Sequence, residues 1–198
     1  MTSRRQRQAE ATKRDIQQAA RRLFAERGYA ATSVGEIARE ADVAVQTIYS
    51  SIGSKGAVAV SLVDLIDAEV DIGPLLRQLP EIESPAEVIA LMARVTRLIN
   101  ERCGDILAVL RSASPAEPDA LEAANEGRRR HRFGARRMAA RLAELGALRE
   151  GVSREHAGDV LTLLTSSETW MQLRREHGWS YDRCERWIRA ALERLLLP

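Results

Sequence analysis

The stretch Thr32–Lys55, TSVGEIAREADVAVQTIYSSIGSK, decides how this chain folds. Thr32 and Ser33 are residue types that begin helices, because their hydroxyls accept hydrogen bonds from N–H groups of the first turn. Apolar residues follow at helical spacing, and a second short helical run over 45–51 comes after a break at Asp42-Val43-Ala44. We therefore predict two short amphipathic helices joined by a tight turn, which is a helix-turn-helix arrangement.

The second of these helices has the composition of a DNA recognition helix. Ile48 is predicted to face inward, while amides and hydroxyls face outward, where they can reach base edges in the major groove. We expect Gln46 and Thr47 to read bases, and Tyr49 and Lys55 to hold the phosphate backbone of a double-stranded operator. The full set of predicted DNA-binding residues is Thr32, Ser33, Val45, Gln46, Thr47, Tyr49, Ser50 and Lys55.

The wider run Phe24–Lys55 closely resembles the DNA-binding domain of the TetR family of transcriptional regulators. The matching motifs are F-x-x-x-G-Y-x-x-T-S, E-I-A-x-x-A-x-V, T-I-Y and the S-K that opens the fourth helix. The chain departs from the family after the tyrosine, where Ser50, Ser51 and Ile52 replace the usual aromatic residues and remove possible phosphate and sugar contacts. The resemblance implies a dimer on a palindromic operator and an inducer pocket in the C-terminal domain.

Composition favours an all-α fold. The 198 residues are 45% hydrophobic, 29% charged and only 4% aromatic, and Gly and Pro are sparse. Residues 1–55 carry ten Lys or Arg against six Asp or Glu, whereas the remainder carries twenty against twenty-two. Because only the front is basic, we expect only the front to meet phosphate. We predict a DNA-binding domain over 1–55 and a ligand-binding and dimerisation domain over 56–198.

Other function classes find little support in the sequence. Cys103 and Cys184 form neither a disulfide framework nor a metal signature, and the three histidines lie far apart. No apolar run is long enough to span a membrane, and the N-terminus lacks the apolar segment of a secretory signal. We expect a cytoplasmic protein that is not an enzyme and needs no cofactor or metal. A ligand-independent architectural DNA-binding protein and, less favoured, an all-α enzyme remain as alternatives.

Helical patterns account for the rest of the chain, giving about nine helices in total. Residues 1–10 are polar and basic and are expected to fray, either as a solubilising tail or as a basic arm against DNA. The fourth helix is apolar on almost every side, so we expect it to be buried and to link the two domains mechanically. The predicted helices cover 11–27, the two short ones above, 55–70, 85–103, 105–113, 117–145, 154–177 and 181–197.

The last two predicted helices carry more apolar surface than one partner layer needs. Apolar residues step by three and four along both, which is typical of a helix–helix seam. Either the surface covers the chain's own core, or it is buried against a second copy as a two-fold four-helix bundle. The residues predicted to form a homodimer interface are Val160, Leu164, Ser167, Met171, Tyr181, Cys184, Ile188, Ala191 and Leu195.

The long helix 117–145 has one face that is small in the middle and carries a lone histidine, His131. Such a histidine is usually a satisfied core residue, and small residues often only permit close packing. The other interpretation is a ligand cavity, because pockets between bundle helices are mostly apolar with a few polar groups. For a small, largely apolar effector we predict the lining residues Met92, His131, Met138 and Trp170. The favoured function is a ligand-responsive transcriptional regulator, most simply a repressor released by its ligand.

Overall fold

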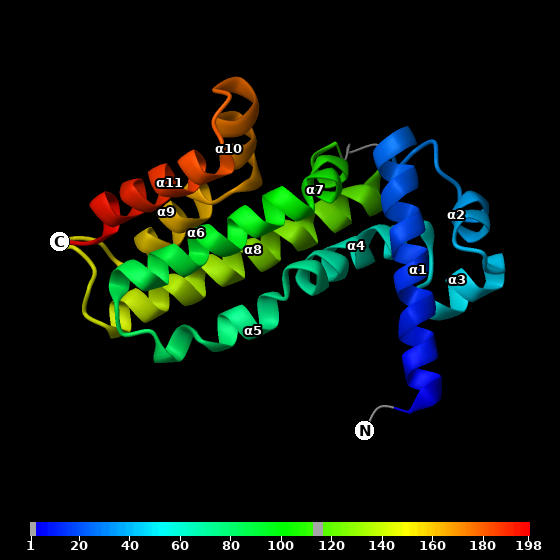
Figure 1. Cartoon of the computed structure of the whole chain (residues 1–198), viewed down its shortest axis with the longest axis horizontal. Helices are drawn as coiled ribbons and strands as arrows, with labels where there is room; N and C mark the ends of the chain where they lie inside the picture. The colour runs from blue at the N-terminus through cyan, green and yellow to red at the C-terminus, as the bar shows by residue number, and fades with distance from the viewer. Residues whose placement is uncertain (1–2, 113–116) are drawn as a thin grey trace. The chain divides into compact units, whose positions relative to one another are not determined.

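The computed structural model describes residues 3–112 and 117–198, and every regular element in these ranges is helical, which confirms the all-α prediction (Figure 1). Contacts divide the chain into two compact units: unit 1 comprises Met1–Ala68 and Gly104–Gly127, and unit 2 comprises Glu69–Cys103 and Arg128–Pro198. The helices are α1 (Arg4–Arg27), α2 (Val34–Glu40), α3 (Val45–Ser51), α4 (Lys55–Val70), α5 (Ile72–Arg77), α6 (Pro85–Arg102), α7 (Gly104–Arg111), α8 (Pro118–Glu144), α9 (Arg154–Leu164), α10 (Ser167–Met171) and α11 (Tyr181–Leu196).

Unit 1 is built around α1, with α2 and α3 lying along one side of it (Figure 1). One face of α1 is buried, and Leu23 and Phe24 on it join Ile37 of α2 and Ile48 of α3 in the core. Helix α3 covers the residues that the sequence predicts, and α2 begins directly after Ser33, one of its two predicted caps. The division of function at residue 55 remains a proposal, because the contacts group α7 and the start of α8 with the front helices.

The predicted fraying of residues 1–10 is wrong for the described part of that segment. Helix α1 begins at Arg4, because Ser3 and Gln6 form a capping box. The Ser3 hydroxyl accepts a hydrogen bond from the Gln6 N–H at 3.2 Å, and the Ser3 N–H donates to Gln6 Oε1 at 2.8 Å. The described part of this segment is therefore a helical extension with exposed arginines, and a contact of these arginines with DNA stays a prediction. Met1 and Thr2 lie outside the described residues.

Helix α4 is deeply buried, as its apolar composition predicts. Val58, Leu62 and Leu65 are among its buried residues. Within unit 1, α1 is also tied to α7, since the Arg21 guanidinium holds both carboxylate oxygens of Asp105, with 2.8 Å between Nη2 and Oδ1. None of the described helices is long and apolar enough to cross a membrane.

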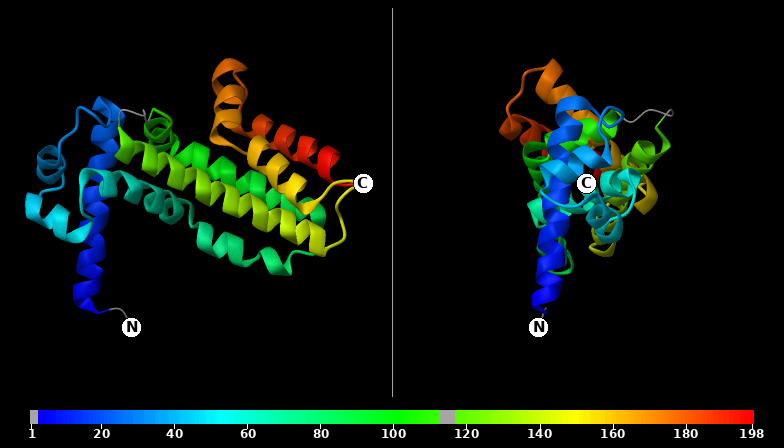
Figure 2. Two further views of the ribbon diagram at one scale, coloured as in Figure 1. Left: turned by 180° about the vertical axis from the view of Figure 1, so that it is seen from behind. Right: turned by 90° about the vertical axis from the view of Figure 1, so that its right-hand side faces the viewer.

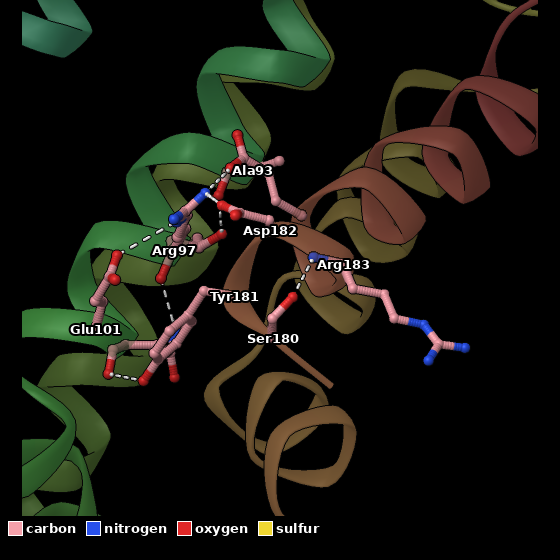
Figure 3. Close-up of polar contacts among 10 residues, drawn as sticks. Ala93, Arg97, Glu101, Ser180, Tyr181, Asp182 and Arg183 are labelled. Carbon is pink, nitrogen blue, oxygen red and sulfur yellow. Dashed lines mark hydrogen bonds and ion pairs between the residues drawn. The ribbon is translucent and has the colours of Figure 1, made fainter. Parts of the chain in front are cut away.

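Unit 2 is a helical bundle in which α6 and α8 run side by side and α9 and α11 cover them (Figure 2). Its core includes Val88 and Met92 of α6, Met138 of α8 and Leu161 of α9. The pairing of α6 with α11 is reinforced by ion pairs, because Arg97 reaches Glu101 on its own helix and Asp182 and Glu185 on α11 (Figure 3).

Two segments of unit 2 differ from prediction. The helix predicted over 154–177 is broken: α9 ends at Leu164, and Ser166 caps α10 by accepting a hydrogen bond from the Thr169 N–H at 3.1 Å. A π-helical turn over Gln172–Glu176 then follows. The short helix α5 and a 3-10 turn over Leu79–Glu81 were not predicted, and the predicted end of α7 at Ala113 lies outside the described residues.

Candidate nucleic-acid interface

The first helix of the motif, α2, is started by a capping box. The Ser33 hydroxyl accepts a hydrogen bond from the Glu36 N–H at 3.2 Å, and the Ser33 N–H donates to Glu36 Oε2 at 2.8 Å. Hydrogen bonds from the Ser33 backbone and hydroxyl lower the pKa of the Glu36 carboxyl. Ser33 is therefore exposed but already engaged in fixing the start of α2.

The turn between α2 and α3 is held by its backbone. Asp42 has a φ of 52°, a left-handed conformation that Asp tolerates better than most residues. The Val43 N–H donates to the Ala38 carbonyl at 2.9 Å and closes the turn. On the far side Ile48 is fully buried and anchors α3 to the core. The turn and this anchor together determine which face of α3 is exposed.

That exposed face of α3 carries the predicted reading side chains. Gln46 and Ser50 are exposed, Thr47 is half-buried, and Tyr49 is 51% exposed. The Ser50 hydroxyl donates to the Thr47 carbonyl at 3.2 Å, as hydroxyls in helices commonly do. Val45, the first residue of α3, is also exposed. A short, anchored helix with polar side chains free on one face has the geometry to enter a DNA groove.

Thr32 and Lys55 both make polar contacts within the chain. Thr32 is only 1% exposed, and its hydroxyl donates to the Gly28 carbonyl at 2.9 Å. A direct DNA contact by the Thr32 side chain conflicts with this burial. The Lys55 ammonium donates to the carbonyls of Tyr29 and Thr32, both at 3.0 Å, and lies 4.1 Å from the centroid of the Tyr29 ring. We call Tyr29, Thr32 and Lys55 the junction, because α2 and α4 both start from it.

Neither Tyr29 of the junction nor the residue that Tyr29 contacts, Asp119, was selected from the sequence. Tyr29 is buried, and its hydroxyl lies 3.4 Å from Oδ2 of Asp119 in the first turn of α8. Burial and the nearby negative charge of Asp119, with a smaller contribution from Glu117, raise the pKa of Tyr29 to about 12. Tyr29 stands in the G-Y motif and was available to sequence reasoning, but nothing in the sequence connects it with a residue ninety positions later.

A helix-turn-helix whose second helix presents an open polar face defines a DNA-binding protein. Residues 16–62 match the family model of bacterial regulatory proteins of the tetR family. Over these residues the chain is similar to the DNA-binding domain of the TetR family of transcriptional regulators. No curated protein shows significant sequence similarity to the chain.

Solved structures of regulators share the fold along nearly the whole chain. The SmeT–triclosan complex, whose protein is from Stenotrophomonas maltophilia, superposes with a TM-score of 0.75 at 20% identity, covering 95% of this chain and 92% of that one. Native NalD from Pseudomonas aeruginosa gives 0.75 and 20%, covering 95% and 98%. A regulator from Saccharomonospora viridis in complex with choline gives 0.69 and 19%, covering 96% and 99%. At these identities the likeness establishes the fold alone.

The four predicted ligand-binding residues lie in unit 2. Met92, Met138 and Trp170 belong to its apolar core, and the Trp170 indole N–H donates to the Thr96 hydroxyl at 3.3 Å. His131 Nε2 lies 2.9 Å from the Thr165 hydroxyl, whose own proton goes to the Leu161 carbonyl at 2.7 Å. The Thr165 oxygen therefore accepts from His131, which fixes the neutral ring with its proton on Nε2.

A groove of about 500 Å³ lies elsewhere on unit 2, between α8 and α9. Its walls include none of the four predicted ligand-binding residues and carry mostly charged side chains. The lining residues are Phe133, Arg136, Arg137, Ala140, Arg154, Glu155 and Asp159.

The predicted dimerisation residues divide into two groups. Cys184 and Ile188 are fully buried in the chain's own core, so they have no surface left for a second copy, and their assignment to an interface needs correction. Leu195 is exposed, and the remaining six are half-buried. Two exposed apolar residues on the same helices are not among the nine, namely Leu163 on α9, at 68% exposure, and Trp187 on α11. The half-buried residues are Val160, Leu164, Ser167, Met171, Tyr181 and Ala191.

Proposed function

We propose that the protein is a transcriptional repressor that binds a palindromic DNA operator as a homodimer and is released by a small, largely apolar molecule. The observation that carries this proposal is the open polar face of α3, anchored from behind by the buried Ile48. The solved relatives support it, since SmeT and NalD are repressors of multidrug efflux pumps. Two such faces one DNA turn apart, roughly 34–36 Å, can read a palindrome together.

The deciding experiment is a salt-titrated binding assay with genomic fragments that include the DNA beside the protein's own coding region. Tight binding to one discrete palindromic fragment is expected, with weaker binding elsewhere. Equal, weak binding to all fragments would contradict operator recognition and favour an architectural role. Binding without release by any compound would also favour the architectural alternative.

Base reading is assigned to Gln46 and Thr47. Gln46→Ala should lower the preference for the cognate base pair by about 1–3 kcal/mol, because a bidentate amide contact is lost. Binding to random DNA should change little. Ser51→Ala, near the exposed end of α3, is the matched control and should leave sequence preference unchanged.

Phosphate contacts are assigned to Tyr49 and to Lys55. Tyr49→Phe should weaken all DNA binding alike, because only a backbone contact is removed. Lys55 has two of its three N–H donors engaged by carbonyls, which leaves one for a phosphate. Replacing Lys55 with Met should reduce the salt slope of log affinity by about 1. An unchanged slope would restrict Lys55 to its structural role in the junction.

The dimer interface is assigned to an apolar stripe on α9 and α11, which pack against each other. The stripe combines exposed Leu163, Trp187 and Leu195 with half-buried Val160 and Ala191. Leu163→Arg and Trp187→Arg should give monomers in sedimentation and lose tight operator binding, because two half-sites no longer act together. Phe133→Arg, an exposed apolar residue on α8, is the control and should remain dimeric.

The effector is assigned to the core beside Met92, His131, Met138 and Trp170. These side chains are already packed, so a ligand has to separate them, which favours a change in geometry on binding. Triclosan, the molecule bound by SmeT, is the first probe to test. In a Trp179→Phe protein it should quench tryptophan fluorescence and release DNA. Quenching without release would separate binding from regulation.

A further inference from the structure

The first turn of α8 touches the front of unit 1 at two places. Asp119 Oδ2 lies 3.4 Å from the Tyr29 hydroxyl. The same carboxylate lies against Gly56, the second residue of α4. A Cβ at Gly56 would come within 2.4 Å of the Asp119 Cγ and 2.5 Å of Oδ2. Asp119 can therefore occupy its place only because residue 56 has no side chain.

Glycine in the first turn of α4 calls for a reason. It costs helix stability relative to alanine, because it loses more backbone freedom on folding. A carboxylate beside a helix N-terminus is in turn favoured by the helix dipole. The Gly56–Asp119 approach supplies both the reason for the glycine and a favourable electrostatic contact for α4.

The junction connects the Asp119 contact with the helix-turn-helix. The Tyr29 ring and carbonyl hold the Lys55 ammonium, which also binds the Thr32 carbonyl. Thr32 directly precedes Ser33, the cap of α2, and Lys55 is the first residue of α4. Asp119 is thus connected through Tyr29 and Lys55 to the starts of both helices, and every contact in the series lies within unit 1.

We propose that Asp119 is a positioning residue for DNA binding, which fixes the start of α2 relative to α4 and so makes operator affinity depend on where the first turn of α8 lies. This inference rests on the proposed function in assuming that α3 binds an operator. Helix α8 runs without interruption from Pro118 to Glu144, with residues 118–127 in unit 1 and the rest in unit 2. A displacement of α8 caused by effector binding in unit 2 can therefore move Asp119, because both belong to the same helix.

The first test compares specific and random DNA for Asp119→Asn. Losing a negative charge by itself should strengthen all DNA binding slightly. If Asp119 positions the motif, operator affinity should fall about tenfold while affinity for random DNA does not fall. The specificity ratio, which is operator affinity divided by affinity for random DNA, should therefore drop. Simple destabilisation would reduce the active fraction for both DNAs alike. Glu26→Gln removes the same charge from an exposed site on α1 and should not lower the ratio.

The second test approaches the same contact from α4. Gly56→Ala should displace the carboxylate and lower the ratio as Asp119→Asn does. Combined with Asp119→Gly, it should be no worse than Asp119→Gly alone, because the contact is already lost. An unchanged ratio in both single variants, or independent losses that multiply in the double variant, would overturn the inference.

Amide hydrogen exchange on DNA-free protein provides a readout that does not require an operator. Asp119→Asn and Gly56→Ala should speed exchange in α2 and the first turn of α4, and leave α11 unchanged. Unchanged exchange in α2 would overturn the positioning role whatever the DNA result. If the wild-type protein binds no operator, the proposed function is refuted, and so is the effect of Asp119 on DNA binding. Hydrogen exchange would then still decide whether Asp119 holds the junction in place.

Discussion

The polar contacts at the entry to the helix-turn-helix and those that pair the helices of the rear bundle span very different distances along the sequence. In the front, Ser33 bonds to Glu36 and Thr32 to Gly28, so partners lie three or four residues apart. In unit 2, Arg97 reaches Glu185, and Arg141 donates to the Ile82 carbonyl at 3.1 Å, across 88 and 59 residues respectively. A motif held by contacts between near neighbours can be predicted from a short stretch of sequence. The packing of a bundle held by distant contacts cannot, because the residues that meet are set by the fold of the whole chain.

The largest expected effect tests how small the front core is. Ile48→Ala should destabilise unit 1 by about 2–5 kcal/mol, because a fully buried side chain is replaced by a cavity. Denaturation should show loss of the front before the bundle, and α1–α3 should lose hydrogen-exchange protection. Val45→Ala on the exposed side of α3 should be nearly neutral in stability. Equal loss of protection in α11 would mean that the two units unfold together.

The next effect tests whether the junction is structural. Lys55→Met should cost about 1.5–3 kcal/mol in the free energy of unfolding, because two charge-assisted bonds to carbonyls are lost. The chain's other lysine is the matched control: Lys13 makes a half-exposed ion pair with Asp64 at 3.6 Å. Lys13→Met should cost less than about 1 kcal/mol. Equal costs in urea unfolding would contradict the role given to the junction.

A smaller effect is expected from the long-range ion pairs of unit 2. Hydrogen bonds to Glu185 and then to Asp182 raise the pKa of Arg97, so the guanidinium is held in its charged form. Arg97→Met should cost about 1 kcal/mol at low salt and less at about 1 M salt, where the charges are screened. Arg154→Met, which breaks an exposed pair with Glu155, should change unfolding little at either salt. No salt dependence in Arg97→Met would leave packing as its only contribution.

The smallest effect concerns pH. Burial lowers the pKa of His131, partly offset by the charge of Glu168, so the folded state binds this proton less readily than the unfolded state. The stability contributed by the neutral ring is fully present above about pH 6.5 and falls as pH drops through the unfolded value toward the lower folded one. His131→Gln should therefore flatten the decline in melting temperature below pH 6.5. Exposed His156→Gln should retain the wild-type decline.

The sequence predicted the front helices closely because their caps and turn are encoded within a few residues. Two other helix caps are also encoded locally but were not predicted. Ser3 and Gln6 form a capping box that begins α1 seven residues before its predicted start, and Ser166 caps α10 inside a predicted continuous helix. These are errors of reading, because the spacing of cap and partner is visible in the sequence.

The predicted interface failed in part for a different reason. Helical periodicity shows that α11 has apolar residues on more than one side, but not which side the rest of the chain covers. Ile188 and Trp187 are neighbours in sequence, about 100° apart on the helix, and only the fold decides that the first is buried and the second exposed. The contact of Tyr29 with Asp119 could not be predicted either, because it joins segments separated by the six helices α2 to α7.

The composition of unit 1 limits where this chain can be joined to part of a structural relative. The front helices share a compact unit with Gly104–Gly127, which lies beyond α5 and α6 in the chain. A chimaera joined at residue 55 or 68 would take the front from one parent and the Asp105 and Asp119 contacts from another, where nothing ensures that they match. Exchange of operator specificity between relatives should therefore succeed when residues 1–68 and 104–127 are transplanted together. A fusion with a single boundary in the sequence cannot transfer both segments of unit 1 without also transferring the part of unit 2 between them.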